Sequence, residues 1–191
     1  MLVGCLIRHF KIYENVAFAP ISQGIDGHFS IFTGNNGSGK SSILEALNHF
    51  FHQSGWLINS NAKKENAYVA PIFLIKKSKF NSKTSNQILE IISEYFWSIA
   101  DISETHHLYA TISQNNELRK LLQYINFLRD NFNPQDYYLF LIGLQYPNKF
   151  PYFATFDNDL LEKLKLNQEE IKLIYDDIIN FYSYLYIPVE S

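Results

Sequence analysis

The 191-residue sequence predicts an α/β fold, and two observations support that prediction. Residues 28 to 33 (HFSIFT) form a short apolar run of β-favouring residues, and residues 40 to 53 carry apolar residues at helical spacing. The glycine-rich segment GNNGSGKSS, residues 34 to 42, lies between them. A strand that passes through a glycine loop into a helix is the arrangement that proteins use to hold phosphate groups.

The glycine-rich segment matches the pattern G-x-x-x-x-G-K-[ST] at Gly34, Gly39, Lys40 and Ser41. Glycines lack a Cβ atom, so the loop can adopt positive φ and turn its N–H groups inward. Lys40 is expected to reach the β- and γ-phosphates as the catalytic lysine, and the Ser41 hydroxyl to ligate Mg²⁺. The predicted nucleotide-binding residues are Gly34, Asn35, Asn36, Gly37, Ser38, Gly39, Lys40, Ser41 and Ser42.

The helix that follows the loop has one apolar face, which predicts that it packs on the sheet of a P-loop NTPase. The residues expected on that face are Ile43, Leu47, Phe50 and Phe51. The residues expected to point elsewhere are Glu45, Asn48, His49 and His52.

Composition bounds the class of protein. The formal net charge is -3, so no overall basic field indicates nucleic acid. The single cysteine, Cys5, cannot form an internal disulfide, which fits a reducing compartment. No apolar run approaches the ~20 residues of a membrane span. We therefore expect a soluble cytoplasmic protein.

The first 50 residues resemble the N-terminal lobe of ABC-type ATPase heads of the RecF/SMC/Rad50/OLD-like group. Those proteins open with I-x-x-F-[RK]-x-[FY] and continue with G-x-N-G-x-G-K-[ST]-x-[IL]-L-E-A-[IL]. The first pattern is matched here by Ile7, Phe10, Lys11 and Tyr13. The second is matched by Gly34, Asn36, Gly37, Gly39, Lys40, Ser41, Ile43, Leu44, Glu45, Ala46 and Leu47. Residues 184 to 191 are similar to the strand that precedes the helical arm in OLD-like proteins.

The resemblance implies ATP and Mg²⁺ as cofactors, a mixed sheet, and a homodimer or higher oligomer formed through the ATPase heads. It also implies a signature motif and a strand ending in Asp-Glu, neither of which is found. Asp176 and Asp177 come closest, but they lie in a segment with helical periodicity, where both are expected on an exposed face. We therefore expect these 191 residues to be the N-terminal part of a longer polypeptide. Gln114 and Gln145 are alternative candidates for the glutamine loop of such heads.

Three ranges are predicted: an ATPase lobe (1–58), a mainly helical, aromatic-rich insertion of that lobe (59–184), and a strand (185–191) leading to a further part. Within the insertion, 67–75 is a strand-like run in which Pro71 indicates an edge or a bulge. Thr84 and Gln87 are expected to cap a helix. Helices are expected over 88–100, with Ile88, Ile91, Ile92, Tyr95 and Phe96 inward, and over 116–132, with Leu118, Leu121, Leu122, Ile125 and Leu128 inward. The run 137–145 is expected to be a buried strand, and Asn167 and Glu170 to form a capping box.

Four lysines in eight residues form the one basic cluster: Lys76, Lys77, Lys79 and Lys83. They are candidates for contacts to a nucleic-acid backbone, and Phe80 between them for stacking on a base. The alternative is a solvated loop before a helix.

Three functions remain open. The first is an ATP-hydrolysing head of a DNA-related ABC-type ATPase, in repair or anti-phage defence, whose nucleotide-driven dimer switch controls a nuclease or nucleic-acid partner. The second is a non-hydrolytic scaffold that senses nucleotide. The third is a small P-loop kinase, which the low number of arginines, three in the chain, disfavours.

Overall fold

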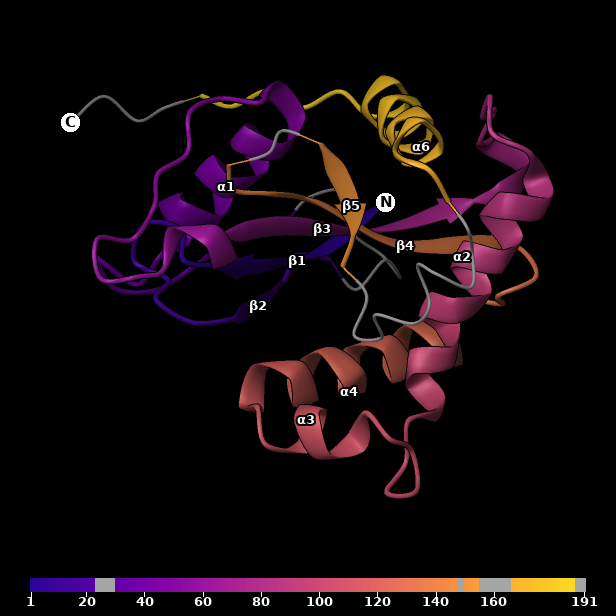
Figure 1. The fold of residues 1–191 in the computed structure, drawn as a ribbon, viewed down its shortest axis with the longest axis horizontal. Coiled ribbons are helices and arrows are strands. Elements are labelled where there is room, and N and C mark those ends of the chain that lie inside the picture. The colour runs from indigo at the N-terminus through magenta and orange to yellow at the C-terminus, as the bar shows by residue number, and fades with distance from the viewer. Residues whose placement is uncertain (23–29, 148–149, 155–165, 188–191) are drawn as a thin grey trace.

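A five-stranded antiparallel sheet forms the centre of the molecule (Figure 1). The computed structural model describes residues 1–22, 30–147, 150–154 and 166–187. The strand order is β2-β1-β3-β4-β5. The strands are β1 (Leu2–Arg8), β2 (Ala17–Pro20), β3 (Tyr68–Lys76), β4 (Tyr137–Gln145) and β5 (Pro151–Phe153).

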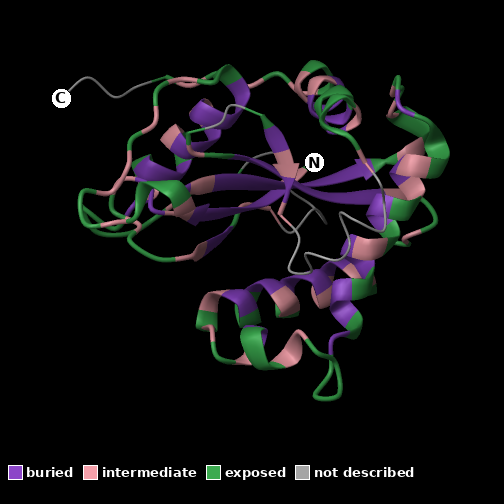
Figure 2. Ribbon diagram, viewed as in Figure 1, coloured by how far each residue is buried: buried purple, intermediate pink, exposed green. Residues whose placement is uncertain are grey.

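Helices cover both faces of the sheet. In Figure 1, α1 and α6 lie above it, α3 and α4 lie below it, and α2 runs along one end. The helices are α1 (Lys40–His52), α2 (Asn86–Ser98), α3 (Tyr109–Ser113), α4 (Asn116–Asn131) and α6 (Gln168–Phe181), with 3-10 turns at Lys64–Asn66, Lys77–Lys79 and Ile99–Asp101. Figure 2 shows that burial is concentrated in the sheet and on the helix faces turned toward it.

The strands β3 and β4 are buried along almost their whole length, because both faces are covered by helices. The Phe50 ring of α1 lies 5.7 Å from that of Phe73 in β3 and 5.2 Å from that of Tyr175 in α6. The Tyr175 hydroxyl donates a hydrogen bond to the Phe50 carbonyl at 2.6 Å. The helix that begins at the glycine loop is therefore fixed to the middle of the core.

Two expectations about the sheet are corrected. The sheet is antiparallel throughout the described residues rather than mixed. Residues 30–33 of the expected strand 28–33 are not in a strand, and residues 28 and 29 lie outside the described part. Ile31 is 74% exposed. A strand needs a neighbour for its N–H and C=O groups, and none of the described strands lies beside this run.

Pro71 stands in a central strand, not at an edge, because β3 pairs with β1 on one side and β4 on the other. The pairing of β3 with β4 skips Ala70 and Pro71, as a residue without an N–H requires. A Cβ atom on Gly143 of β4 would lie 2.5 Å from the Val69 carbonyl oxygen. Glycine thus permits the close approach of the two backbones at the point where proline removes a ladder hydrogen bond.

Range 59–184 is rich in helix, as expected, but it also supplies β3, β4 and β5. These strands continue the sheet that β1 and β2 begin, so ranges 1–58 and 59–184 share one sheet. Residues 185–187 are not in a strand, and 188–191 lie outside the described part. The exposed fractions of Leu185 and Ile187 are 82% and 75%, which reflects the lack of a neighbouring strand among the described residues.

The predicted helices are present, with local corrections. The N-cap of α2 is Ser85 rather than Thr84, and its hydroxyl accepts a hydrogen bond from the Ile88 N–H. On α2, Ile91 is 42% exposed, because the face turned to β4 carries Leu89, Ser93 and Trp97 together with the expected Ile92 and Phe96. The inward face of α4 is confirmed except for Leu122, which is half-buried.

Two polar residues expected to point outward are buried. His49 is 1% exposed, with its ring 4.2 Å from that of Trp56. Asp177 is 8% exposed and accepts hydrogen bonds from the Ser82 hydroxyl at 2.6 Å and the Lys83 N–H at 2.8 Å. The capping box of Asn167 and Glu170 is confirmed, and so is the helical state of Asp177. Burial of Asp177 is tolerated because its carboxylate is hydrogen-bonded to the neighbouring loop.

Candidate functional site

The glycine loop turns sharply at three glycines. The φ angles of Gly34, Gly37 and Gly39 are 150°, 82° and 92°, which side chains rarely permit. Gly39 is the N-cap of α1, which has neither a side-chain cap nor an acidic residue in its first turn. The N–H groups at this helix start are therefore left to an external acceptor, and the helix dipole favours an anion there.

The Lys40 side chain folds back over the loop. Its Nζ atom donates to the carbonyl oxygens of Gly34 at 2.6 Å and Asn35 at 2.8 Å, and lies 3.2 Å from Ser38 Oγ. Among the described residues, no carboxylate pairs with this ammonium group. A phosphate placed on the loop would therefore meet an ammonium charge that is held by neutral groups alone.

The two serines after Lys40 differ in exposure. Ser41 is exposed at the helix start, as a ligand of Mg²⁺ would have to be. Ser42 is 4% exposed and belongs to the buried face of α1. Ser42 was predicted to bind nucleotide, but burial leaves only its backbone N–H for that role. Residues 34–38 are all exposed, Lys40 is half-buried and Gly39 is buried, so the open part of the predicted site is residues 34–38 together with Ser41.

The turn after β1 packs against the end of the loop. A Cβ atom on Gly39 would lie 2.6 Å from the Tyr13 hydroxyl oxygen and 2.8 Å from Ile12 Cδ1. The Tyr13 hydroxyl lies 3.3 Å from the Gly39 carbonyl oxygen, to which it donates. Burial raises the pKa of Tyr13, and the fields of Cys5 and Glu117 add to the rise, so the hydroxyl stays protonated as a donor.

An ion pair joins the same turn to the helix. The Lys11 ammonium lies beside the Glu45 carboxylate in the second turn of α1, and both side chains are largely covered. Sequence reasoning placed Lys11 and Tyr13 in a family pattern without a contact to the loop. It placed Glu45 in the second family pattern and off the apolar face of the helix, without a partner in either case. The only sequence feature that could have indicated this contact is the family pattern that includes residues 10 to 13.

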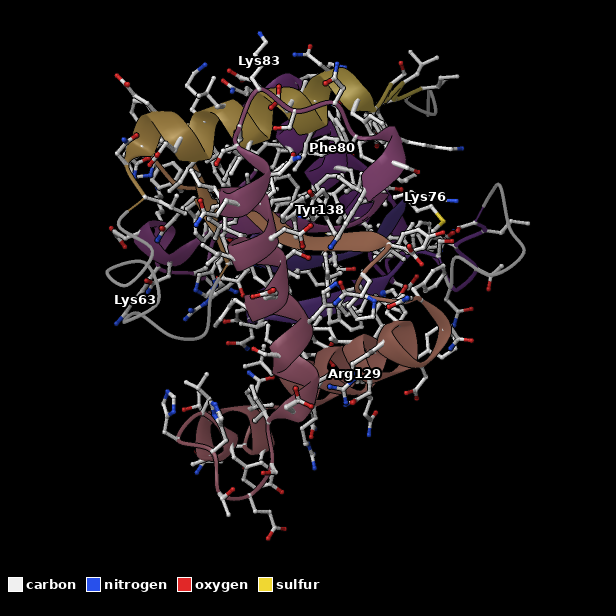
Figure 3. All side chains as sticks on the ribbon, turned by 90° about the vertical axis from the view of Figure 1, so that its right-hand side faces the viewer. Lys63, Lys76, Phe80, Lys83, Arg129 and Tyr138 are labelled. Atoms are coloured by element: carbon white, nitrogen blue, oxygen red, sulfur yellow. The ribbon has the colours of Figure 1, made fainter. Side chains whose placement is uncertain are left out.

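The lysine cluster is partly committed to other contacts. Lys77 Nζ lies 2.5 Å from Glu90 Oε2 and 5.0 Å from the centre of the Tyr138 ring. Lys76, Lys79 and Lys83 are exposed. Figure 3 shows Lys76 and Lys83 on opposite sides of Phe80, so the cationic groups do not converge.

Two aromatic rings already contact Phe80, the candidate platform for a base. Its ring packs edge-on against Tyr138 at 6.2 Å and Phe181 at 5.5 Å. Stacking on a nucleobase needs an open ring face, and this side chain is already half-buried.

Neither candidate for the glutamine loop is supported by a contact with the glycine loop. Gln145 ends β4, and its amide donates to the Glu65 carbonyl at 3.2 Å. Gln114 follows the helix α3 rather than the expected strand-like run.

The glycine loop, its lysine and the uncapped helix start define a P-loop nucleotide-binding protein. Residues 1–187 match the family model described as AAA ATPase domain, so the chain belongs to that family of ATP-binding ATPases. No curated protein and no solved structure gives a significant match. No helix in the described ranges is long and apolar enough to cross a bilayer.

Proposed function

We propose that residues 34 to 42 bind Mg²⁺ and ATP, and that Lys40 and Ser41 are the two side chains that contact them. The geometry of Lys40 is the observation that carries this proposal. Its ammonium group lies above the loop, with donors directed at the Gly34 and Asn35 carbonyls. When ATP is bound, this charge would face the β- and γ-phosphates, and the Ser41 hydroxyl would face Mg²⁺.

The residues of the glycine loop fit a bound ATP with Mg²⁺. The three positive-φ glycines allow the turns of the loop, open space surrounds the Cβ position of Gly37, and the helix start offers N–H groups without a competing side chain. Bound Mg²⁺ would supply positive charge that neutralises the phosphates. The chain's own contribution is to bind, orient and hold positive charge at a fixed place.

We further propose that the chain acts as the head of a DNA-related ATPase, in repair or anti-phage defence, that switches a nuclease or nucleic-acid partner through a nucleotide-driven dimer. The resemblance of the first 50 residues supports this role. Exposed Lys76, Lys79 and Lys83 could contribute charge to a nucleic-acid contact, whereas Lys77 is held by Glu90. A DNA-binding role predicts an affinity for DNA that falls steeply with salt.

A nucleotide-sensing scaffold is the second candidate. The described strands end at Arg8, Pro20, Lys76, Gln145 and Phe153, none of which is the carboxylate that hydrolysis requires. If ATP is hydrolysed at this site, the carboxylate has to come from somewhere other than the ends of these described strands.

The deciding experiment measures Mg·ATP affinity and turnover for wild type, Lys40→Ala and the surface control Lys172→Ala. We expect Lys40→Ala to lose most of the affinity, because a charge-assisted contact disappears, and Lys172→Ala to behave as wild type. Equal ATP affinity of wild type and Lys40→Ala would refute the site. ATP binding without turnover in wild type would favour the sensing scaffold over the hydrolysing head.

A further inference from the structure

Glu45 contacts two segments that lie outside the phosphate loop: the turn after β1, through Lys11, and residues 182–187, through Tyr186. It lies in the second turn of α1, one turn beyond the glycine loop. Its Oε2 atom is buried, and the Lys11 ammonium lies beside that atom without the alignment of a hydrogen bond. The Tyr186 hydroxyl lies 3.5 Å from Oε1. Residues 182–187 reach this point by running back over α1 (Figure 1).

The backbone that carries Lys11 is held in an unusual conformation. Lys11 has a φ of 49°, and His9 a φ of 56°, in the left-handed region that non-glycine residues rarely adopt. Backbone hydrogen bonds hold Lys11 there: its N–H donates to the Leu57 carbonyl, and its carbonyl accepts from Asn59 Nδ2, both at 2.6 Å. Conformations of this kind persist where the surrounding structure fixes them, and they concentrate at functional sites.

The same turn contacts the loop at a second place. Tyr13 donates to the Gly39 carbonyl at 3.3 Å, and the would-be Cβ of Gly39 is blocked by Tyr13 and Ile12. The turn is thus attached to α1 at the N-cap through Tyr13 and at the second turn through Lys11. Two attachments fix both the position and the direction of the helix start.

We propose that Lys11, Tyr13 and Glu45 are positioning residues of the nucleotide site. They hold the junction of Gly39 and Lys40 in the orientation that directs the helix N–H groups and the lysine ammonium at the phosphates. This inference rests on the proposed binding of ATP at residues 34 to 42. It adds that affinity depends on three side chains outside that segment, none of which needs to touch the nucleotide.

The charges of Lys11 and Glu45 determine whether each substitution strengthens or weakens Mg·ATP binding. Lys11→Met leaves the Glu45 carboxylate uncompensated near the phosphate loop, where it repels an anionic ligand. Glu45→Gln removes that repulsion but also releases Lys11. Positioning therefore predicts weaker Mg·ATP binding for both variants, by roughly tenfold, because small misplacements of binding groups cost up to about 10²-fold.

The test is a charge-reversal cycle, measured as Mg·ATP affinity by calorimetry and as the melting temperature of the nucleotide-free protein. The variants are Lys11→Met, Glu45→Gln and the double reversal Lys11→Glu with Glu45→Lys. The matched control reverses the exposed pair of Lys172 and Asp176, whose atoms lie 2.7 Å apart on α6. We expect the double reversal to recover affinity to within about threefold of wild type, and the control to change it less than twofold.

Tyr13→Phe keeps the ring against Gly39 and removes only the hydrogen bond. We expect about fivefold weaker Mg·ATP binding and a melting temperature lowered by only about 2–4 °C, corresponding to one hydrogen bond. This variant separates positioning from folding if Lys11→Met or Glu45→Gln proves unstable.

One outcome would overturn the positioning role and leave the proposed function standing. In that outcome Lys11→Met, Glu45→Gln and Tyr13→Phe bind Mg·ATP with wild-type affinity, whereas Lys40→Ala does not bind it. A double reversal that restores the melting temperature but not the affinity would also overturn it. A wild-type protein that does not bind Mg·ATP would overturn both proposals.

Discussion

Gly39 is the point at which the stability of the fold and the geometry of the site are most directly linked. Replacing it with alanine combines two unfavourable effects. The backbone has a φ of 92°, where a side chain is strained. The new methyl group would also lie 2.6 Å from the Tyr13 hydroxyl oxygen and 2.8 Å from Ile12 Cδ1, closer than real Cβ contacts.

The two effects can be estimated separately. Holding a non-glycine residue at positive φ costs about 1–3 kcal/mol. Forcing an additional methyl group into a filled space costs about 1–3 kcal/mol. Gly39→Ala is therefore expected to lower the free energy of unfolding by about 2–6 kcal/mol. Each kcal/mol corresponds to roughly 2–4 °C in Tm for a domain of this size.

The other glycines provide matched controls for the same substitution. Gly55 has no positive φ and open space around its Cβ position, so Gly55→Ala should be nearly neutral. Gly37 has a φ of 82° and nothing within 4 Å, so Gly37→Ala should show the strain alone. Gly143 has no positive φ, but its Cβ would meet Val69 and Ala70, so Gly143→Ala should show the clash alone.

The assay is urea-induced unfolding of the four alanine variants and the wild type, followed by circular dichroism. The expected order of stability is wild type and Gly55→Ala first, Gly37→Ala next, and Gly39→Ala below Gly37→Ala. A Gly39→Ala protein as stable as Gly37→Ala would refute the contact of Tyr13 and Ile12 with the loop. Gly39→Ala should also weaken Mg·ATP binding, because relief of the clash displaces the helix start.

Two further predictions concern residues outside the phosphate loop. Asp177→Ala should lower the free energy of unfolding by about 1.5–3 kcal/mol, since it removes the acceptor of two hydrogen bonds, while Asp176→Ala on the same helix should cost about 0–1 kcal/mol; equal losses in thermal unfolding would contradict the buried role of Asp177. Burial alone would raise the pKa of Glu117, but hydrogen bonds from Lys120 and the Phe18 N–H outweigh it and lower the pKa below its ordinary value of 4.5. A lowered pKa in the folded state contributes stability above pH 4.5 that is lost as the pH falls through the folded value. Unfolding of Glu117→Gln between pH 6 and pH 3 should therefore show a smaller loss of stability than wild type, and a parallel loss would contradict this assignment.

Local sequence signals determined the glycine loop, α1, α4, β4 and the capping box of α6. Each depends on a short-range property: positive φ at glycine, apolar residues at a period of 3.6, or a side chain that caps its own helix. The assignment to a P-loop site needed no more than these, because the lysine and the glycines that form it are within nine residues of one another.

Tertiary structure decided what depends on neighbours far away in the sequence. Residues 30–33 have the composition of a strand but no partner among the described strands, so composition alone was misleading. Pro71 could enter a central strand because Gly143, 72 residues later, permits close contact with β4. His49 and Asp177 each lie on the face of their helix that the apolar periodicity predicts to be exposed. Other segments of the chain cover both residues, and the periodicity of a helix carries no information about such distant neighbours.

The contacts that hold the glycine loop in place also depend on the tertiary structure. The sequence by itself predicted a phosphate loop with Lys40 as its cation. That Lys11 and Tyr13 hold the loop follows only from the turn after β1, which the sheet and the Leu57 and Asn59 contacts place against α1. The physical reason is that a loop motif encodes its own backbone conformation, whereas its orientation is set by whatever the rest of the chain packs against it.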